Sequence, residues 1–143
     1  MSYDEDVSKQ NASETGIKQE CVYNKLPSFH VSDNVYCDLM HNILEGVCRY
    51  VMAAVLSYFI FTKRFITVHT FNSRICEFTY DYSSTPPCLS ADHIKKSSLI
   101  LSAIEMLNLT LGLSLMIGDL IPDADDIWEL YLMLRKIVVF AVG

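Results

Sequence analysis

The stretch LMHNILEGVCRYVMAAVLSYFIF, from Leu39 to Phe61, has the spacing of a helix and sets the fold class. Its apolar residues recur at three- and four-residue steps, which places them on one helical face. The residues of this stripe are Met40, Ile43, Leu44, Val47, Val51, Ala54, Val55 and Tyr58. Beyond Tyr50 the stretch is apolar nearly all round, so we expect this helix to be buried on several sides.

Two further helices are expected in the middle of the chain. Thr67 can cap the first, and its apolar stripe is Val68, Phe71, Ile75 and Phe78. The second is expected over about 97–117, where Ser102 and Glu105 have the spacing of a capping box. A segment rich in Ser, Thr and Pro, residues 83–87, separates the two helices.

A fourth helix is expected near the C-terminal end. Three acidic residues open it and complement the positive end of its dipole; they are Asp123, Asp125 and Asp126. Its expected apolar stripe is Ile127, Leu130, Tyr131, Leu134, Ile137 and Val138. The sequence therefore predicts a mainly α-helical protein of about four helices.

The region before Asp38 differs in character from the rest. Residues 1–22 are polar and lack an apolar period, which predicts a disordered leader followed by a mostly helical domain over residues 23–143. Two short apolar segments, Leu26–Val31 and Val35–Cys37, favour one or two short strands just before Asp38.

Charge and cysteine content restrict the function. The net charge is -6, and an acidic chain gains nothing from neutralising phosphates, so we expect no unaided nucleic-acid binding. The five cysteines include no Cys-x-x-Cys pair, which favours reduced thiols over a zinc site or a disulfide framework. The acidic N-terminus resembles no signal peptide, so an intracellular protein is expected.

The high apolar content, with a mean hydropathy of +0.25, also raises the question of a membrane span. The uncharged run Val51–Phe61 is about half the length needed to cross a bilayer. The segment Leu99–Ile121 is long enough but carries Glu105 and Asp119, which are costly in a bilayer. Buried core helices are the preferred interpretation, and a membrane-associated helical protein is kept as an alternative.

The string from Asp38 to Val47, DLMHNILEGV, resembles the Asp-x-Met-His-x-x-Leu-x-Gly-Val string of CACTA-like cut-and-paste DNA transposases and of transposon-derived proteins related to them. The preceding Leu26–Val31 resembles the stretch that leads into that string. Downstream, Met116–Pro122 and Ile127–Tyr131 resemble a helical region of the same derived proteins. The resemblance covers roughly residues 15–140.

In that family an RNase H-like sheet, joined to a helical insertion, presents carboxylates that hold two Mg²⁺ ions. The resemblance implies that Asp38 is a metal-binding acid placed after a strand, and that His41 orients it or contacts phosphate. The residues alone also allow Asp38 to be a helix N-cap and His41 to make a hydrogen bond in the first turn. Asp38 and His41 are therefore candidates for the vestige of a DDE-type active site.

A working site would need further acidic residues in positions that this chain does not supply. We therefore expect a catalytically inert, transposon-derived remnant with no cofactor of its own, nuclear by resemblance. The alternative is a small helical protein-interaction module. In both cases a protein partner, or self-association, is expected through apolar helix faces.

Overall fold

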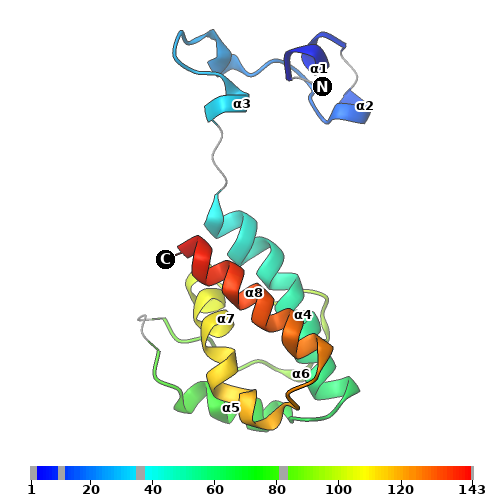
Figure 1. Ribbon diagram of the computed structural model, residues 1–143, viewed down its shortest axis with the longest axis vertical. Coiled ribbons are helices and arrows are strands. Elements are labelled where there is room, and N and C mark those ends of the chain that lie inside the picture. The colour runs from blue at the N-terminus through cyan, green and yellow to red at the C-terminus, as the bar shows by residue number, and fades with distance from the viewer. Residues whose placement is uncertain (1–2, 10–11, 35–37, 81–83, 143) are drawn as a thin grey trace. The chain divides into compact units, whose positions relative to one another are not determined.

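The computed structural model describes residues 3–9, 12–34, 38–80 and 84–142, and Figure 1 shows its helical architecture. These residues form a mainly α-helical protein with eight α-helices and no β-strand, so the predicted class is confirmed and the expected count of about four helices is wrong. The chain divides into two compact units, Met1–Cys37 and Asp38–Gly143. This division lies downstream of the boundary near residue 22 that the sequence suggests.

Unit 1 is built from short helical segments. They are α1 (Tyr3–Lys9), α2 (Ala12–Thr15), the 3-10 turn η1 (Val22–Lys25) and α3 (Val31–Asn34), and none of their described residues is buried. The Tyr3 hydroxyl accepts a hydrogen bond from the Cys21 backbone N–H at 2.7 Å. Helices α1 and α2 lie in the stretch expected to be a disordered leader, and its disorder in solution stays a prediction.

The strand expected over Leu26–Val31 is absent from the described part of unit 1, where α3 begins at Val31 instead. Side-chain oxygens accept hydrogen bonds from backbone N–H groups that a strand would donate to a neighbouring strand. Asn24 accepts from the Val31 N–H at 2.9 Å, and Asn34 accepts from the His30 N–H at 2.8 Å. Local capping of this kind competes with strand pairing. The second expected strand, residues 35–37, lies outside the described residues.

Unit 2 begins with one long helix that changes its winding twice. A π-helical stretch, η2 (Met40–Cys48), leads into α4 (Arg49–Ser57), and a second π-helical stretch, η3 (Tyr58–Thr62), ends it. Fully or nearly buried residues recur at four-residue steps; they are Leu44, Cys48, Met52, Leu56 and Ile60. Ala53, Val55 and Phe59 are buried as well. The i→i+5 bonds of a π-helix wind η2 and η3 more widely than the about 3.6 residues per turn of α4.

The wider winding corrects the expected stripe of this helix. Val47 and Ala54, both placed in the core by the sequence pattern, are exposed. Cys48 and Met52, absent from that pattern, are fully buried.

The remaining helices are α5 (Val68–Glu77), α6 (Ala91–Lys95), α7 (Ala103–Ile117) and α8 (Asp126–Val142), with a 3-10 turn, η4 (Gly118–Leu120), after α7. Thr67 caps α5 by accepting from the Thr70 N–H at 3.0 Å, as predicted. The Ser102–Glu105 capping box is also present, so α7 begins at Ala103 rather than near residue 97. Helix α6 is five residues long and was not expected.

Helix α7 lies at the centre of unit 2. It packs against η2, α5 and α8, while α4 packs against α6 and α8. Because α7 has neighbours on several sides, nine of its 15 residues are buried. Its link to α8 is polar as well as apolar: the Tyr131 hydroxyl donates to the Thr110 carbonyl at 2.9 Å and accepts from the Ser114 N–H at 2.8 Å.

Two helical segments, Met40–Thr62 and Ala103–Leu120, are long and apolar enough to cross a membrane by length and composition. In each, about half of the most apolar window is buried inside the protein, at 44% and 50%. The core helices of a soluble protein have the same character, so these two segments are weak support for a membrane span.

Candidate functional site

The Asp38–His41 pair lies at the beginning of the long helix of unit 2. One Asp38 carboxylate oxygen, Oδ1, accepts the His41 backbone N–H at 3.1 Å, and the other, Oδ2, lies 2.6 Å from His41 Nδ1. Both side chains are exposed, His41 to 60% and Asp38 to 54%. The structure therefore brings the two candidates together, as a local cap and ion pair at the helix end.

The pair changes the acidity of both groups. The hydrogen bond from the His41 ring, followed by the one from its backbone N–H, lowers the pKa of Asp38. The hydrogen bond to Asp38 and the charge of that carboxylate raise the pKa of His41, with a smaller contribution from Glu45. Glu45 Oε2 lies 3.9 Å from His41 Nε2, so the imidazole lies between two carboxylates. This arrangement favours an imidazolium held at the helix end.

Gly46 has a steric role in the same stretch. A Cβ atom built at this position would lie 2.9 Å from the His41 carbonyl oxygen. The contact arises because the π-helical winding of η2 brings residues five apart against each other. The glycine of the transposase-like string therefore permits the winding that carries His41.

The string also borders an apolar hollow between η2 and the beginning of α7. Met40, Leu44 and Glu45 form one wall of this hollow, and Ser102, Ala103, Ile104 and Leu107 form the other. His41 and Asp38 are not part of its lining. In the described ranges of the chain, no three His, Cys, Asp or Glu side chains are grouped so as to hold a metal ion.

Other acidic residues of unit 2 have structural partners. Asp119, after α7, forms a two-bond ion pair with Arg74 of α5 at 3.0 and 2.9 Å, and this pairing lowers the pKa of Asp119. Asp125 caps α8 by accepting the N–H groups of Ile127 and Trp128 at 3.0 and 3.1 Å. The Asp125 cap agrees with the expectation that acidic residues open the fourth helix.

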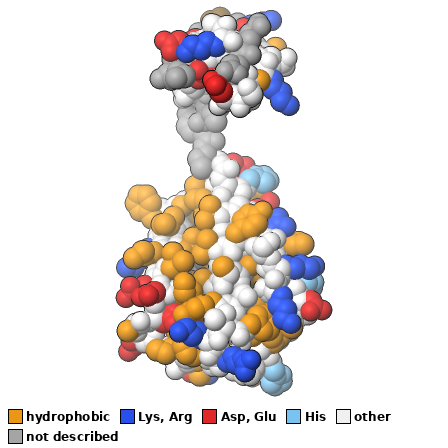
Figure 2. Space-filling view, turned by 90° about the vertical axis from the view of Figure 1, so that its right-hand side faces the viewer, with side chains coloured by type: hydrophobic (Ala, Val, Ile, Leu, Met, Phe, Trp, Pro, Cys, Tyr) orange, Lys and Arg blue, Asp and Glu red, His pale blue; other side chains and the backbone are white. Residues whose placement is uncertain are grey.

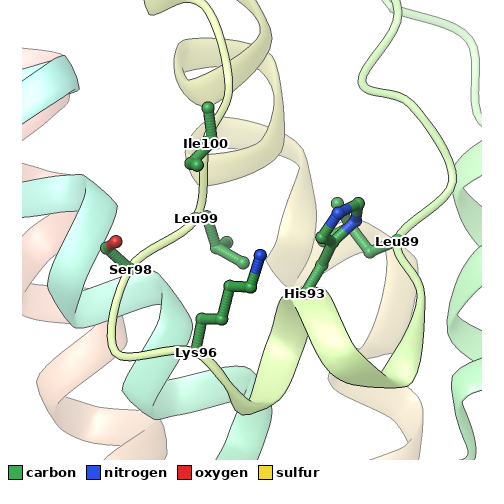
Figure 3. A pocket seen from close by; sticks show the side chains of 6 residues that line it. All are labelled: Leu89, His93, Lys96, Ser98, Leu99 and Ile100. Atoms are coloured by element: carbon green, nitrogen blue, oxygen red, sulfur yellow. The ribbon is translucent and has the colours of Figure 1, made fainter.

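A second, small hollow lies between α6 and the segment that follows it (Figure 3). Its lining is Leu89, His93, Lys96, Ser98, Leu99 and Ile100. Its volume of about 30 Å³ is room for one or two water molecules. It is too small for an organic ligand.

The outer face of α8 is also apolar. Four apolar side chains on this face point to solvent, and we call them the α8 seam: Leu130, Met133, Ile137 and Phe140. Phe140 is 92% exposed. Figure 2 shows hydrophobic side chains gathered on the face of unit 2 that it displays. Contiguous apolar patches on a protein surface often mark interaction sites.

Leu130 and Ile137 were expected in the core, and this expectation is wrong. The buried side of α8 is formed instead by Trp128, Tyr131, Leu134 and Val138. Both rows have three- and four-residue spacing, so periodicity alone does not tell which one is covered. The signal that could have identified the seam is the presence of two apolar rows on one helix.

Comparisons with known proteins add no identity: the chain matches no protein-family model, no curated protein and no solved structure.

Proposed function

We propose that unit 2 is a helical association module that pairs with a second copy of the chain through the α8 seam. In this proposal the transposase-like string, from Asp38 to Val47, is a transposon-derived remnant that caps a helix and has no catalytic role by itself. The observation that carries the proposal is the row of four exposed apolar side chains on α8.

The spacing of the seam suits a helix as its partner. Steps of three, four and three residues separate Leu130, Met133, Ile137 and Phe140, and this alternation is the pattern of knobs-into-holes packing between two helices. A two-fold dimer places the same patch of both copies face to face, so the apolar, uncharged row of one copy packs against the identical row of the other. A second copy is therefore the simplest cover for this seam.

The local bonding of Asp38 supports a structural role for the string. Both carboxylate oxygens of Asp38 are engaged by His41, one through the backbone and one through the ring. A carboxylate used in this way satisfies a donor at the helix end. The same bonds orient His41 without requiring a metal.

The test of self-association is the molar mass of the full chain in solution. Size-exclusion chromatography with light scattering should give a dimer at micromolar concentrations, and Ile137→Glu should shift it to the monomer. Val139→Glu is the matched control, because Val139 is 48% exposed on α8 but lies outside the seam. A monomeric wild-type chain, or equal effects of the two substitutions, would refute the proposal.

The absence of catalysis has a separate test. Supercoiled DNA incubated with the purified chain and Mg²⁺ should stay intact. Nicking that disappears in an Asp38→Ala variant would overturn the proposed remnant role and restore Asp38 as a metal-binding acid. This outcome is independent of whether the chain dimerises.

A further inference from the structure

Two cysteines that lie far from the transposase-like string form a close pair. Cys76 is in the last turn of α5, and Cys88 is in the segment that precedes α6. Their Sγ atoms are 3.3 Å apart, and both residues are exposed. A disulfide has a sulfur–sulfur distance of about 2.05 Å. A movement of little more than an ångström therefore separates this contact from a covalent bond.

The approach of the two sulfurs is fixed by a neighbouring clamp. The Asn72 side chain of α5 donates from Nδ2 to the Leu89 carbonyl, and its Oδ1 accepts from the Leu89 N–H, both at 2.9 Å. Leu89 is buried, with 5% of its surface exposed. Since Leu89 follows Cys88 directly, the clamp holds the thiol of the segment against the thiol of the helix.

Solvent reaches the pair through an open hollow. His69, Ser73 and Glu77 border this hollow together with both cysteines. A hydrogen bond with Cys88 raises the pKa of Cys76, as expected when one proton is held between two sulfurs. The fully buried Cys48 has no comparable access.

We propose that Cys76 and Cys88 form a reversible disulfide that locks the end of α5 to the segment before α6. Reduced thiols are the ground state in a reducing compartment, and the pair closes when small-molecule disulfides accumulate. The oxidant in this proposal is a low-molecular-weight disulfide of the glutathione type.

Closure occurs by two exchange steps. One protein thiolate attacks a sulfur of glutathione disulfide, whose sulfur–sulfur bond breaks and releases one glutathione thiolate. The second protein thiolate then attacks the protein sulfur of the mixed disulfide and releases the other glutathione thiolate. Two protein thiols lose two electrons and two protons, and one glutathione disulfide becomes two glutathione thiols.

The experiment uses the full chain, equilibrated in glutathione buffers of graded redox ratio and then treated with a thiol-alkylating reagent. Cleavage after Lys and Arg yields the peptide Ile75–Lys95, which contains both cysteines. The reduced peptide should carry two alkyl groups, whereas the disulfide form should carry none and be two hydrogen atoms lighter than the unalkylated dithiol peptide. Further cleavage after the aromatic residues Phe78, Tyr80 and Tyr82 should leave two cysteine-containing fragments that separate only on reduction.

Two variants make the proposal specific. Cys88→Ser should abolish the disulfide and leave the melting temperature independent of redox ratio, whereas oxidation should raise that of the wild type by roughly 5–15 °C. Asn72→Ala releases the clamp and should require about tenfold more oxidising buffer for closure, because it lowers the effective concentration of one thiol near the other. Alkylation of both thiols at every ratio, stable mixed disulfides without ring closure, or random pairing with Cys21 would overturn the proposal.

Discussion

The Tyr131 hydroxyl is the polar link between α7 and α8, and Tyr131→Phe removes only its oxygen. The ring stays in place against Trp128, with the two ring centres 4.9 Å apart. The hydroxyl donates to the Thr110 carbonyl and accepts from the Ser114 N–H. These two backbone groups are four residues apart in α7, the spacing of an α-helical hydrogen bond, so the hydroxyl bridges one turn of the helix.

The magnitude follows from the burial of the groups left behind. Tyr131 and Thr110 have no exposed surface, so the Thr110 carbonyl loses its bond where water does not reach it. A buried polar group left without a partner costs about 1–3 kcal/mol. Ser114 is half-buried, which makes its share smaller. We therefore expect Tyr131→Phe to lower the free energy of unfolding by about 2–3 kcal/mol.

Urea unfolding followed by circular dichroism measures this change, and the corresponding loss in melting temperature is roughly 10–20 °C. Tyr50→Phe is the matched control because Tyr50 is 57% exposed, and its loss should stay below about 0.5 kcal/mol. A Tyr131→Phe loss as small as that of the control would refute the reasoning. It would mean that α7 closes its own turn and satisfies both backbone groups without the hydroxyl.

Three further predictions concern the ends and the winding of the helices. His41 should titrate in the folded chain above its usual pKa of 6.5, and Asp38→Asn should lower that value; nuclear magnetic resonance of the ring checks this. The stabilisation from protonated His41 is therefore present below pH 6.5 and is lost as the pH rises through the raised pKa. The stabilisation from ionised Asp38 is lost as the pH falls through its lowered pKa, which lies below 3.8. Gly46→Ala should lower the free energy of unfolding, although the same change in an ordinary helix adds about 1 kcal/mol; urea unfolding that shows a gain would contradict the steric role of the glycine. Asp125→Ala should lower the free energy of unfolding by about 1–2 kcal/mol through loss of the α8 cap. Asp123→Ala, which alters an exposed neighbour, should be nearly neutral, and urea unfolding compares the two variants.

The ends of helices were more predictable than their faces. Thr67 and the Ser102–Glu105 pair act locally, so a few residues of sequence suffice to identify a cap. The buried side of a helix depends on which neighbours pack against it. The sequence placed Val47 in the core, and it is exposed because the π-helical winding of η2 changes the direction of each following side chain.

At the candidate site and on the surface, too, local contacts were predictable and contacts that depend on packing were not. The contact between Asp38 and His41 follows from their three-residue separation at a helix start and was predictable. The Cys76–Cys88 contact was not, because it depends on the segment before α6 folding back onto α5 under the Asn72 clamp. The α8 seam was missed because two apolar rows on one helix have the same period, and only the packing of α7 shows which row is covered.

The π-helical start of the long helix has a consequence for chain length. Nine residues, Met40–Cys48, are wound there more loosely than an α-helix requires. A sequence one residue shorter in this stretch could close into ordinary α-helical turns and still present Met52 and Leu56 to the same neighbours. Single-residue gaps in related sequences should therefore collect between Met40 and Cys48. In the α-helical part of the same helix, α4, that deletion would rotate every following side chain by about 100° and expose the core.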